Sequence, residues 1–295
     1  MPTKVLDSQA GRNGVQKTFN FGGGKNTIDA NDDGVSAYGY IIKSGGGDDI
    51  IIGSDFTGPP PSATGTIVAD PTLNGDLLIG GMGSDTIVGG AGDDWIYGGN
   101  EDGSDGGKGK NPIVFNSLAG EIQRESLSPG ETFTGGDDVI TAGGGIGVSN
   151  FMYGDVQSIS GDVTTTFVGG DDTLIGGANS TDDMVGDFSS TGGAIATTGG
   201  LDTFVIGQNG GDDTIWDFHV FEYVDDGVNV GDTIELVGFG FTQFSDLDDL
   251  WSADASGFAV LNLDGTVDGL GDTVTFLGIT DSNDLSDSFV FTALV

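Results

Sequence analysis

The chain has 295 residues, of which 57 are glycine and none is cysteine, and 46 Asp and Glu face 8 Lys and Arg for a formal net charge of -38 at pH 7. Disulfides and thiolate sites are excluded, collagen is excluded because the glycines follow no Gly-X-Y period, and nucleic acid and anionic membranes are unfavourable partners. Residues 125–295 contain no Lys or Arg, so the expected source of counter-charge is a polyvalent cation.

The first 20 residues, MPTKVLDSQAGRNGVQKTFN, form a predicted N-terminal lead-in. They lack the apolar segment of a secretory signal peptide. No apolar run in the chain reaches the length of a membrane span, so we expect no membrane insertion.

A nine-residue repeat dominates residues 21–216. Its pattern is G-G-x-G-x-D-x-U-x, where U is a large apolar residue, and residues 80–88 (GGMGSDTIV) and 89–97 (GGAGDDWIY) match it in full. Partial copies occupy 21–29, 44–52, 71–79, 133–141, 167–175, 197–205 and 208–216, with looser candidates at 152–156 and 179–186. Internal repetition of this kind is typical of a fold built by stacking one small unit.

The later repeats are interrupted but keep regular intervals. Asp138, Asp155 and Asp172 are 17 residues apart, and Asp202 follows Asp172 by 30. These intervals predict repeats that alternate between two sides of one scaffold. Insertions at about 54–70, 100–132, 145–165 and 187–197 are expected to be loops at the corners, with one helical turn at 117–126.

From residue 217 the repeat stops and segments typical of strands follow. Alternating apolar residues predict strands at 232–239, 257–264, 272–279 and 287–295, and 245–253 fits a short helix. We predict that residues 217–295 form a β-rich C-terminal cap, because a stacked array must cover its last open end.

Each repeat fits one tight turn followed by one short strand. Side chains alternate along a strand, so Leu78, Ile87 and Ile96 are expected to point inward, while the glycines permit positive φ and expose backbone carbonyls. Aspartates of stacked turns repel by about 4 kcal/mol per pair at ~4 Å and an effective dielectric near 20. Ca²⁺ suits such a site because it accepts roughly six to eight oxygen ligands in flexible geometry. Zn²⁺ prefers nitrogen and sulfur, and the chain has one His and no Cys.

These repeats resemble those of the RTX (repeats-in-toxin, haemolysin-type) family of calcium-binding β-roll proteins. The resemblance covers roughly residues 21–216. It implies an all-β fold: a right-handed parallel β-roll, or β-solenoid, with long loop insertions and a β-rich C-terminal cap. It also implies several Ca²⁺ ions, each bound between two turns on the same side by their aspartates and by backbone carbonyls.

The resemblance assigns the candidate calcium ligands to the turns. Asp76 is expected to share an ion with Asp94, Asp85 to share one with the Gly98 carbonyl, and the turn of Asn26 to pair with the turn of Asp49. Spacing alone pairs Asp172 with Asp202 and Asp183 with Asp213. The full set of candidate ligands is Gly22, Gly24, Asn26, Ser44, Gly45, Gly46, Gly47, Asp49, Asp76, Gly81, Gly83, Asp85, Gly89, Gly90, Ala91, Gly92, Asp94, Gly98, Asn100, Asp102, Gly136, Asp138, Asp155, Gly170, Asp172, Asp183, Gly200, Asp202, Gly211 and Asp213.

RTX proteins typically leave the bacterial cell unfolded by a type I route with an uncleaved C-terminal signal. The resemblance therefore implies a secreted, extracellular or cell-surface protein that folds when it meets millimolar Ca²⁺ outside the cell. The terminal segment DSFVFTALV (287–295) resembles such a signal and fits the last strand of the cap equally well.

Three classes of function remain open on these grounds. The first is a structural protein that self-associates into a surface layer, filament or matrix. The second is a calcium-dependent adhesin that binds cell-surface glycans through its insertions or cap. The third is an unrecognised hydrolase, which we consider the weakest because the chain has no HExxH, no G-x-S-x-G and only one histidine, His219 in WDFHVFEY. We predict that the protein is not an enzyme.

Outward strand positions carry apolar residues, which a solvated sheet does not need. They are Ile50, Ile52, Leu77, Ile79, Val88, Trp95, Tyr97 and Trp216. We expect these rows to be covered, either by the insertions at 54–70 and 100–132 or by other copies of the chain.

Overall fold

A computed structural model describes the chain in ranges that begin at residue 4 and end at residue 293. The described residues are 4–5, 17–21, 24–30, 40–45, 49–53, 77–80, 85–89, 95–98, 114–120, 124–126, 129–160, 164–188, 191–192, 196–220, 222–223, 229–263 and 272–293. They are almost entirely β-structure, with two short 3₁₀ helices and no α-helix in these ranges. None of their helices is long and apolar enough to cross a membrane.

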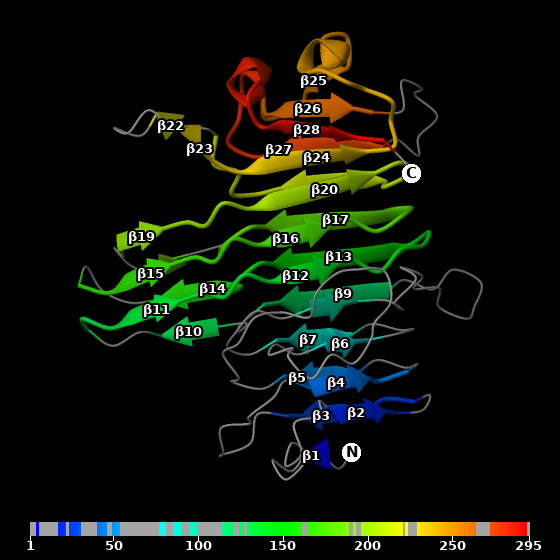
Figure 1. Cartoon of the computed structure of the whole chain (residues 1–295), viewed down its shortest axis with the longest axis vertical. Helices are drawn as coiled ribbons and strands as arrows, with labels where there is room; N and C mark the ends of the chain where they lie inside the picture. Colours follow the sequence, from blue (N-terminus) through cyan, green and yellow to red (C-terminus); the bar gives the residue numbers. More distant parts are fainter. Residues whose placement is uncertain are drawn as a thin grey trace.

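The chain alternates between two large sheets whose neighbouring strands pair almost entirely in parallel (Figure 1). The eleven-stranded sheet contains, in spatial order, β1 (Lys4–Val5), β3 (Thr27–Asp29), β5 (Ile50–Ile52), β7 (Thr86–Val88), β9 (Val114–Ala119), β13 (Val148–Tyr153), β17 (Ser180–Val185), β21 (Asp212–Ile215), β27 (Thr273–Phe276), β26 (Ala259–Asn262) and β25 (Trp251–Ala253). The nine-stranded sheet contains β2 (Lys17–Asn20), β4 (Tyr40–Lys43), β6 (Leu77–Ile79), β8 (Trp95–Tyr97), β12 (Val139–Thr141), β16 (Thr173–Ile175), β20 (Thr203–Gly207), β24 (Thr233–Val237) and β28 (Phe289–Thr292).

The core lies between these two sheets and is made of the apolar position of each repeat. In β7 only the central residue, Ile87, is fully buried, while its neighbours are partly exposed. Leu78 and Ile96 are also fully buried, so the predicted inward direction of the apolar residue is confirmed. One apolar residue per short strand stacks on the next, and the parallel register keeps the column continuous, as in the pairing of Ile140 with Leu174.

Three of the predicted insertions contain strands where loops were expected. Two side sheets, each with parallel strands, lie beside the middle of the large sheets (Figure 1). One side sheet consists of β10 (Arg124–Ser126), β14 (Ser158–Ser160) and β18 (Thr191–Gly192), and the other of β11 (Thr132–Thr134), β15 (Thr166–Val168) and β19 (Ala196–Thr198). The helical turn predicted at 117–126 is wrong, because β9 and β10 occupy its described residues. The insertion at 54–70 lies outside the described residues.

The side sheets enclose a small aromatic core of their own. Phe133 stacks on Phe167 at 5.5 Å between ring centroids, and Phe188 meets Phe167 edge-on at 4.9 Å. Val156 and Phe167 are fully buried. The molecule therefore has a main lobe between the two large sheets and a side lobe between the two side sheets.

The C-terminal residues continue both large sheets before they close them. Strands β24 and β28 extend the nine-stranded sheet in parallel, and β27 extends the eleven-stranded sheet, so the predicted end of the stacking at residue 217 is wrong. The antiparallel strands β25 and β26 and the 3₁₀ helices η2 (Phe244–Leu247) and η3 (Ser282–Leu285) form the actual cap. The four predicted strands in this region are confirmed, and η2 covers part of the predicted helix. The remaining pair, β22 (Glu222–Tyr223) and β23 (Asn229–Val230), forms a separate antiparallel ribbon.

The outward apolar rows differ in how far they are covered. Leu77 and Ile79 are buried in one cluster, against which Tyr97 packs, which agrees with the expectation of cover. Ile50 and Trp216 remain 38% and 51% exposed. The side chain of Trp95 lies outside the described residues.

Candidate functional site

Stacked Asp and Asn residues line the edge at which the chain passes from the nine-stranded to the eleven-stranded sheet, either just before a strand of the eleven-stranded sheet or in its first half. We call this column the edge ladder; its members are Asn26, Asp49, Asp85, Asn116, Asn150, Asp182 and Asp213. Hydrogen bonds of 2.6 to 3.2 Å join each member to the next. All except Asn26 are buried. The column therefore forms because one repeat position recurs in register along the parallel sheets.

The amide of Asn26 occupies the place that the sequence analysis gave to an ion. Its Nδ2 donates to the carbonyl oxygens of Gly24 and Ser44 at 2.6 and 3.4 Å and to Oδ1 of Asp49 at 3.0 Å. These oxygens belong to the two turns that were expected to share Ca²⁺. The Asn26 and Asp49 turns are thus neighbours, and an amide NH₂ group lies among their oxygens. The ion that they were expected to share stays a prediction.

Asp182, and not Asp183, is the ladder residue of its turn. The backbone N–H of Asp182 donates to Oδ1 of Asp213 at 3.2 Å, while Asp183 lies in register with Thr214 and accepts a bond from the indole of Trp216 at 2.9 Å. The predicted pairing of Asp183 with Asp213 is therefore wrong by one residue. The reason is strand alternation: Met184 is buried in the core, so the side chain of Asp182 points inward and that of Asp183 outward.

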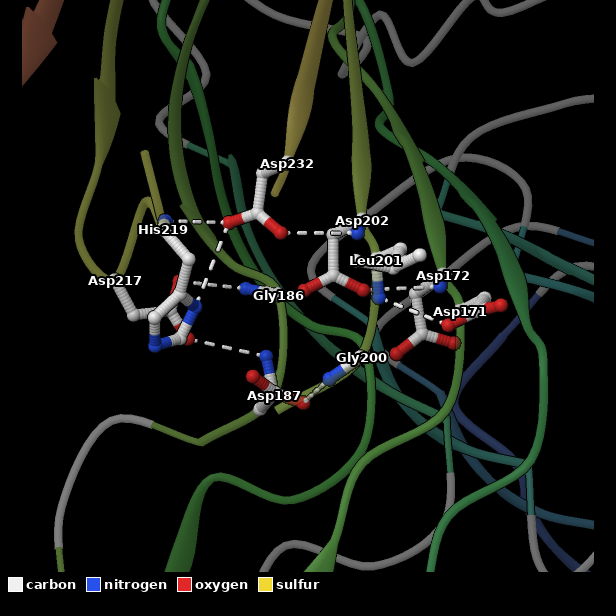
Figure 2. Close-up of polar contacts among 10 residues, drawn as sticks. All are labelled: Asp171, Asp172, Gly186, Asp187, Gly200, Leu201, Asp202, Asp217, His219 and Asp232. Carbon is white, nitrogen blue, oxygen red and sulfur yellow. Dashed lines mark hydrogen bonds and ion pairs between the residues drawn. The ribbon is translucent and has the colours of Figure 1, made fainter. Parts of the chain in front are cut away.

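Two further ladders face each other where the main lobe joins the side lobe. The first waist ladder, on the turns that enter the nine-stranded sheet, contains Asp138, Asp172, Asp202 and Asp232. The second waist ladder, on the turns that leave the eleven-stranded sheet, contains Asp155, Asp187 and Asp217. We call the region between them the waist, and Figure 2 shows its C-terminal part. In the first ladder each backbone N–H donates to Oδ1 of the next aspartate, at 2.7 to 3.0 Å. Asp172 and Asp202 are therefore neighbours in one ladder, while the ion expected between them stays a prediction.

Glycines of each waist wall make room for the aspartates of the opposite wall. A Cβ on Gly154 would lie 1.8 Å from the carbonyl oxygen of Gly186 and 2.0 Å from Oδ2 of Asp172. A Cβ on Gly120 would meet Gly154 O at 1.9 Å and Asp138 Oδ2 at 1.8 Å. A carboxylate oxygen and a glycine carbonyl oxygen therefore converge on one small space beside Gly120 and again beside Gly154. Oδ2 of Asp85 and the Gly98 carbonyl oxygen converge in the same way beside Gly80, and the ion that this pair was expected to share stays a prediction.

Several buried carboxylates use only one of their two oxygens. Oδ2 of Asp49, Asp172, Asp187, Asp202 and Asp213 has no hydrogen-bond partner within the described structure. A buried charge without a partner is costly, and these five residues are at most 2% exposed. The free oxygens therefore require a proton or a cation.

The pKa values of these carboxyls respond to the same confinement. Burial, and next the charges of Asp187 and Asp232, raise the pKa of Asp202 to about 10. Burial followed by repulsion from Asp155, Asp138 and Asp202 raises the pKa of Asp172 well above its usual range. Burial likewise raises the pKa of Asp187 to about 6 and that of Asp217 to about 7. At neutral pH the waist cannot carry all of these charges without counter-charge.

The donor set fits a hard cation. Carboxylate and carbonyl oxygens are the ligands that Ca²⁺ accepts, and beside Gly120 and Gly154 the convergent pair is one carboxylate and one backbone carbonyl. No group of three or more His, Cys, Asp or Glu side chains in the described ranges converges as a metal cluster. An ion at these positions must therefore draw much of its coordination from the backbone.

Many of the predicted ligands lie outside the described residues. They are Gly22, Gly46, Gly47, Asp76, Gly81, Gly83, Gly90, Ala91, Gly92, Asp94, Asn100 and Asp102. The predicted pairing of Asp76 with Asp94 falls among them.

The described glycines of the predicted set have unequal roles. Gly170 and Gly200 donate their N–H groups to Asp155 and Asp187, and Gly136 lies under Gly170 in the waist. Gly89 is buried after β7, whereas Gly45 is exposed after β4. The carbonyl of Gly211 accepts the N–H of Thr273 at 2.8 Å. The hydroxyl of Ser44 donates to the Gly80 carbonyl.

Six ladder residues were missed by the sequence analysis. They are Asn116, Asn150, Asp182, Asp187, Asp217 and Asp232. Of these, Asp232 had a signal in the repeat itself, because Asp232-Thr233-Ile234 has the D-x-U part of the nine-residue pattern. The second waist ladder follows its own pattern, in which Asp155, Asp187 and Asp217 each precede a buried or half-buried Val or Phe.

His219 lies at the C-terminal end of the waist. Its backbone N–H donates to Oδ2 of Asp232 at 2.6 Å, and Nδ1 lies 3.6 Å from the same oxygen (Figure 2). The hydrogen bond to Asp232 raises the pKa of His219 to about 9. The imidazole is therefore protonated at neutral pH and serves as a cation beside the waist, which does not suit a general base.

Comparison with known proteins gives no assignment. No protein-family model matches this chain, and no curated protein matches it.

Proposed function

We propose that this protein is a calcium-binding β-roll of the RTX type, a right-handed parallel solenoid that folds when Ca²⁺ binds between its stacked turns. The observation that carries this proposal is the set of buried aspartate oxygens without a hydrogen-bond partner in ladders that lack Lys and Arg. Ca²⁺ supplies the missing counter-charge and accepts the glycine carbonyls as further ligands. Because the unfolded chain has no such sites, binding contributes directly to folding.

Circular dichroism of the full chain tests this function. In millimolar Ca²⁺ we expect a β-rich spectrum, which EGTA abolishes and renewed Ca²⁺ restores. Mg²⁺ at the same concentration should restore it poorly, because Mg²⁺ gives up its water ligands reluctantly. A β-rich spectrum that is unchanged by EGTA would refute the proposal.

This calcium dependence favours a location outside the cell, where Ca²⁺ is abundant. We further propose that the folded protein has a structural role and associates with copies of itself. Ile50, Phe151 and Trp216 are 38%, 39% and 51% exposed on the outer face of the eleven-stranded sheet, and exposed apolar side chains on one face favour association.

Light scattering with size-exclusion chromatography, with and without Ca²⁺, tests the structural role. We expect assemblies in Ca²⁺ that Phe151→Thr and Trp216→Thr weaken. A strictly monomeric protein at high concentration in Ca²⁺ would exclude self-association but leave calcium-dependent folding intact.

A further inference from the structure

The waist differs from the edge of a simple two-sheet stack because the chain does not turn back there. From β9, β13 and β17 the chain runs on into the side strands β10, β14 and β18, and it returns through β11, β15 and β19 into the nine-stranded sheet. Two separate chain walls therefore pass each other between the lobes, and each wall carries aspartates.

The two walls are complementary at each level. On one wall, Gly186 leaves room for the carboxylate of Asp202, because Oδ2 of Asp202 lies 1.9 Å from the position that a Cβ on Gly186 would take. On the other wall, Gly169 leaves room for Asp187, whose Oδ1 lies 1.7 Å from the corresponding Cβ position. Each wall thus contributes one glycine and one aspartate, and the glycines bring the carboxylates close together.

Residues 125–295, which include the aspartates of both walls, contain no Lys or Arg. The one histidine, His219, acts on Asp187 from the C-terminal end of the waist, where its charge partly offsets the rise that burial causes in the pKa of Asp187. Asp155 repels Asp172, and Asp187 repels Asp202. Within the described part of the chain, Oδ2 of Asp172, Asp187 and Asp202 has no hydrogen-bond partner, and these residues are 1% exposed. These oxygens are buried, point into the waist and require a ligand that brings positive charge.

The third level of the waist is closed in another way. Asp217 accepts the N–H groups of Gly186 and Asp187 at 2.8 and 3.0 Å. Asp232 accepts the N–H groups of Asp202 and His219, and the protonated imidazole lies beside it. Hydrogen bonds and His219 therefore satisfy this level, which marks the C-terminal end of the column (Figure 2).

We propose that the waist binds a column of Ca²⁺ ions, one between Asp155 and Asp172 and one between Asp187 and Asp202, and that these ions fasten the side lobe to the main lobe. The proposal rests on the calcium-dependent folding proposed above, from which it takes the identity of the ion. It goes beyond that function because each ion joins two different walls of the molecule, and because Asp187 lies outside every copy of the nine-residue repeat.

The test uses the full chain and the substitution Asp187→Asn. Asp248→Asn is the matched control, because it removes the same charge from an exposed position of the cap. Bound Ca²⁺ is counted by metal analysis after equilibrium dialysis, and hydrogen exchange is followed by mass spectrometry. We expect Asp187→Asn to bind at least one Ca²⁺ fewer and to lose protection in β14, β15 and β19, while β4 to β7 stay protected. Asp248→Asn should match the wild type in both respects.

The possible results separate the two proposals. A wild-type chain that binds no Ca²⁺ refutes the proposed function itself. A wild-type chain that needs Ca²⁺, together with an Asp187→Asn variant of unchanged ion count and protection, refutes only the waist column.

A second variant covers the case in which Asp187→Asn does not fold. The double substitution Asp187→Asn, Asp202→Asn removes both carboxylates of one level and supplies two amides. Two amides can bond to each other, as the side chains of Asn116 and Asn150 do in the edge ladder. We expect this chain to fold in Ca²⁺ with a reduced ion count. A folded double variant with the wild-type count would overturn the proposal.

Discussion

The edge ladder and the waist stack the same kind of turn but balance their charge differently. In the middle of the edge ladder, Nδ2 of Asn150 donates to Asp182 at 2.6 Å and to the Gly143 carbonyl at 2.9 Å, so an amide links a carboxylate and a carbonyl without any ion. In the waist the same positions are all aspartate, and Asp172 and Asp202 each keep one oxygen without a partner. An amide therefore serves within one ladder the purpose that we assign to Ca²⁺ in the other two.

Because of this difference, we expect the two regions to depend on Ca²⁺ to different degrees. The asparagine rungs are joined by their own amide hydrogen bonds and need no ion, whereas the aspartate levels repel until a cation or a proton enters. The junction of the two lobes should therefore be the part of the molecule most sensitive to Ca²⁺. Each prediction below changes one side of this contrast.

The largest effect is expected from closing the waist with a methyl group. Gly154→Ala places a Cβ 1.8 Å from the Gly186 carbonyl oxygen and 2.0 Å from Asp172 Oδ2, which are backbone and confined atoms that cannot move aside. We expect the side lobe not to fold, seen as lost hydrogen-exchange protection in β14 and β15. At the edge, Gly98→Ala meets its nearest atoms at 3.1 to 3.3 Å and should cost far less.

Gly207→Ala is the control for this comparison, because nothing lies within 4 Å of its Cβ position. Equal stability of Gly154→Ala and Gly207→Ala would show that the two waist walls do not approach as described.

A smaller effect is expected when an amide rung is converted into a carboxylate rung. Asn150→Asp removes the donor to Asp182 and Gly143 and adds a buried charge, so we expect the free energy of unfolding to fall by about 2–4 kcal/mol near the Ca²⁺ threshold for folding. The loss should shrink as Ca²⁺ rises, because an ion can replace the amide. Urea denaturation at several Ca²⁺ concentrations measures both effects.

The control for this charge change is Asn20→Asp, which adds an acid at an exposed position. If Asn150→Asp were as stable as Asn20→Asp at every Ca²⁺ concentration, the amide would not have the role that we give it.

Protons should replace Ca²⁺ in the waist more readily than at the asparagine rungs. The pKa values of Asp187, Asp217 and Asp202 in the folded chain are raised to about 6, about 7 and about 10, above the ordinary value near 4 of the unfolded chain. Carboxyls with raised pKa values favour the folded state when protonated, and this stabilisation is lost as the pH rises through the folded pKa.

The folded state of the metal-free protein should therefore become more stable as the pH falls from 8 to 5, and its content of β-structure should rise. Circular dichroism of the desalted chain across this range measures it, and saturating Ca²⁺ should flatten the profile. Metal-free protein that instead loses β-structure as the pH falls from 8 to 5 would contradict the account of the waist.

The sequence predicted the main lobe well because two simple periods act there together. Alternation along each strand places Ile87 and Ile96 inward, and the nine-residue spacing places one acid in every turn. The doublet Asp182-Asp183 shows the limit: either residue fits the spacing, and only the burial of Met184 decides between them. Asn150 was missed because an amide can take an aspartate's place in the ladder.

The side lobe could not be predicted from the repeat. Strands β10, β14 and β18 lie outside every copy of the nine-residue pattern, and β11, β15 and β19 overlap only the first residues of a copy. The core of the side lobe depends on contacts among Phe133, Phe167 and Phe188, which are far apart in the sequence. The continuation of the sheets after residue 217 had a local signal in Asp232-Thr233-Ile234. That signal was a single copy 30 residues after Asp202. Only the parallel pairing of β24 with β20 shows that this copy continues the nine-stranded sheet.

The smallest effect is expected at the protein cation that ends the waist. His219→Gln keeps the backbone donor to Asp232 but removes the imidazolium, and because the side chain is 57% exposed solvent screens most of the attraction, so we expect a loss below about 1 kcal/mol. The pKa of His219 is raised in the folded state to about 9, so its contribution is full below about pH 6.5 and disappears as the pH rises through 9. Urea denaturation of both chains in Ca²⁺ should therefore show a small difference at pH 6 and none at pH 10. A difference of the same size at both pH values would mean that His219 acts through packing, and the waist would then end on hydrogen bonds alone.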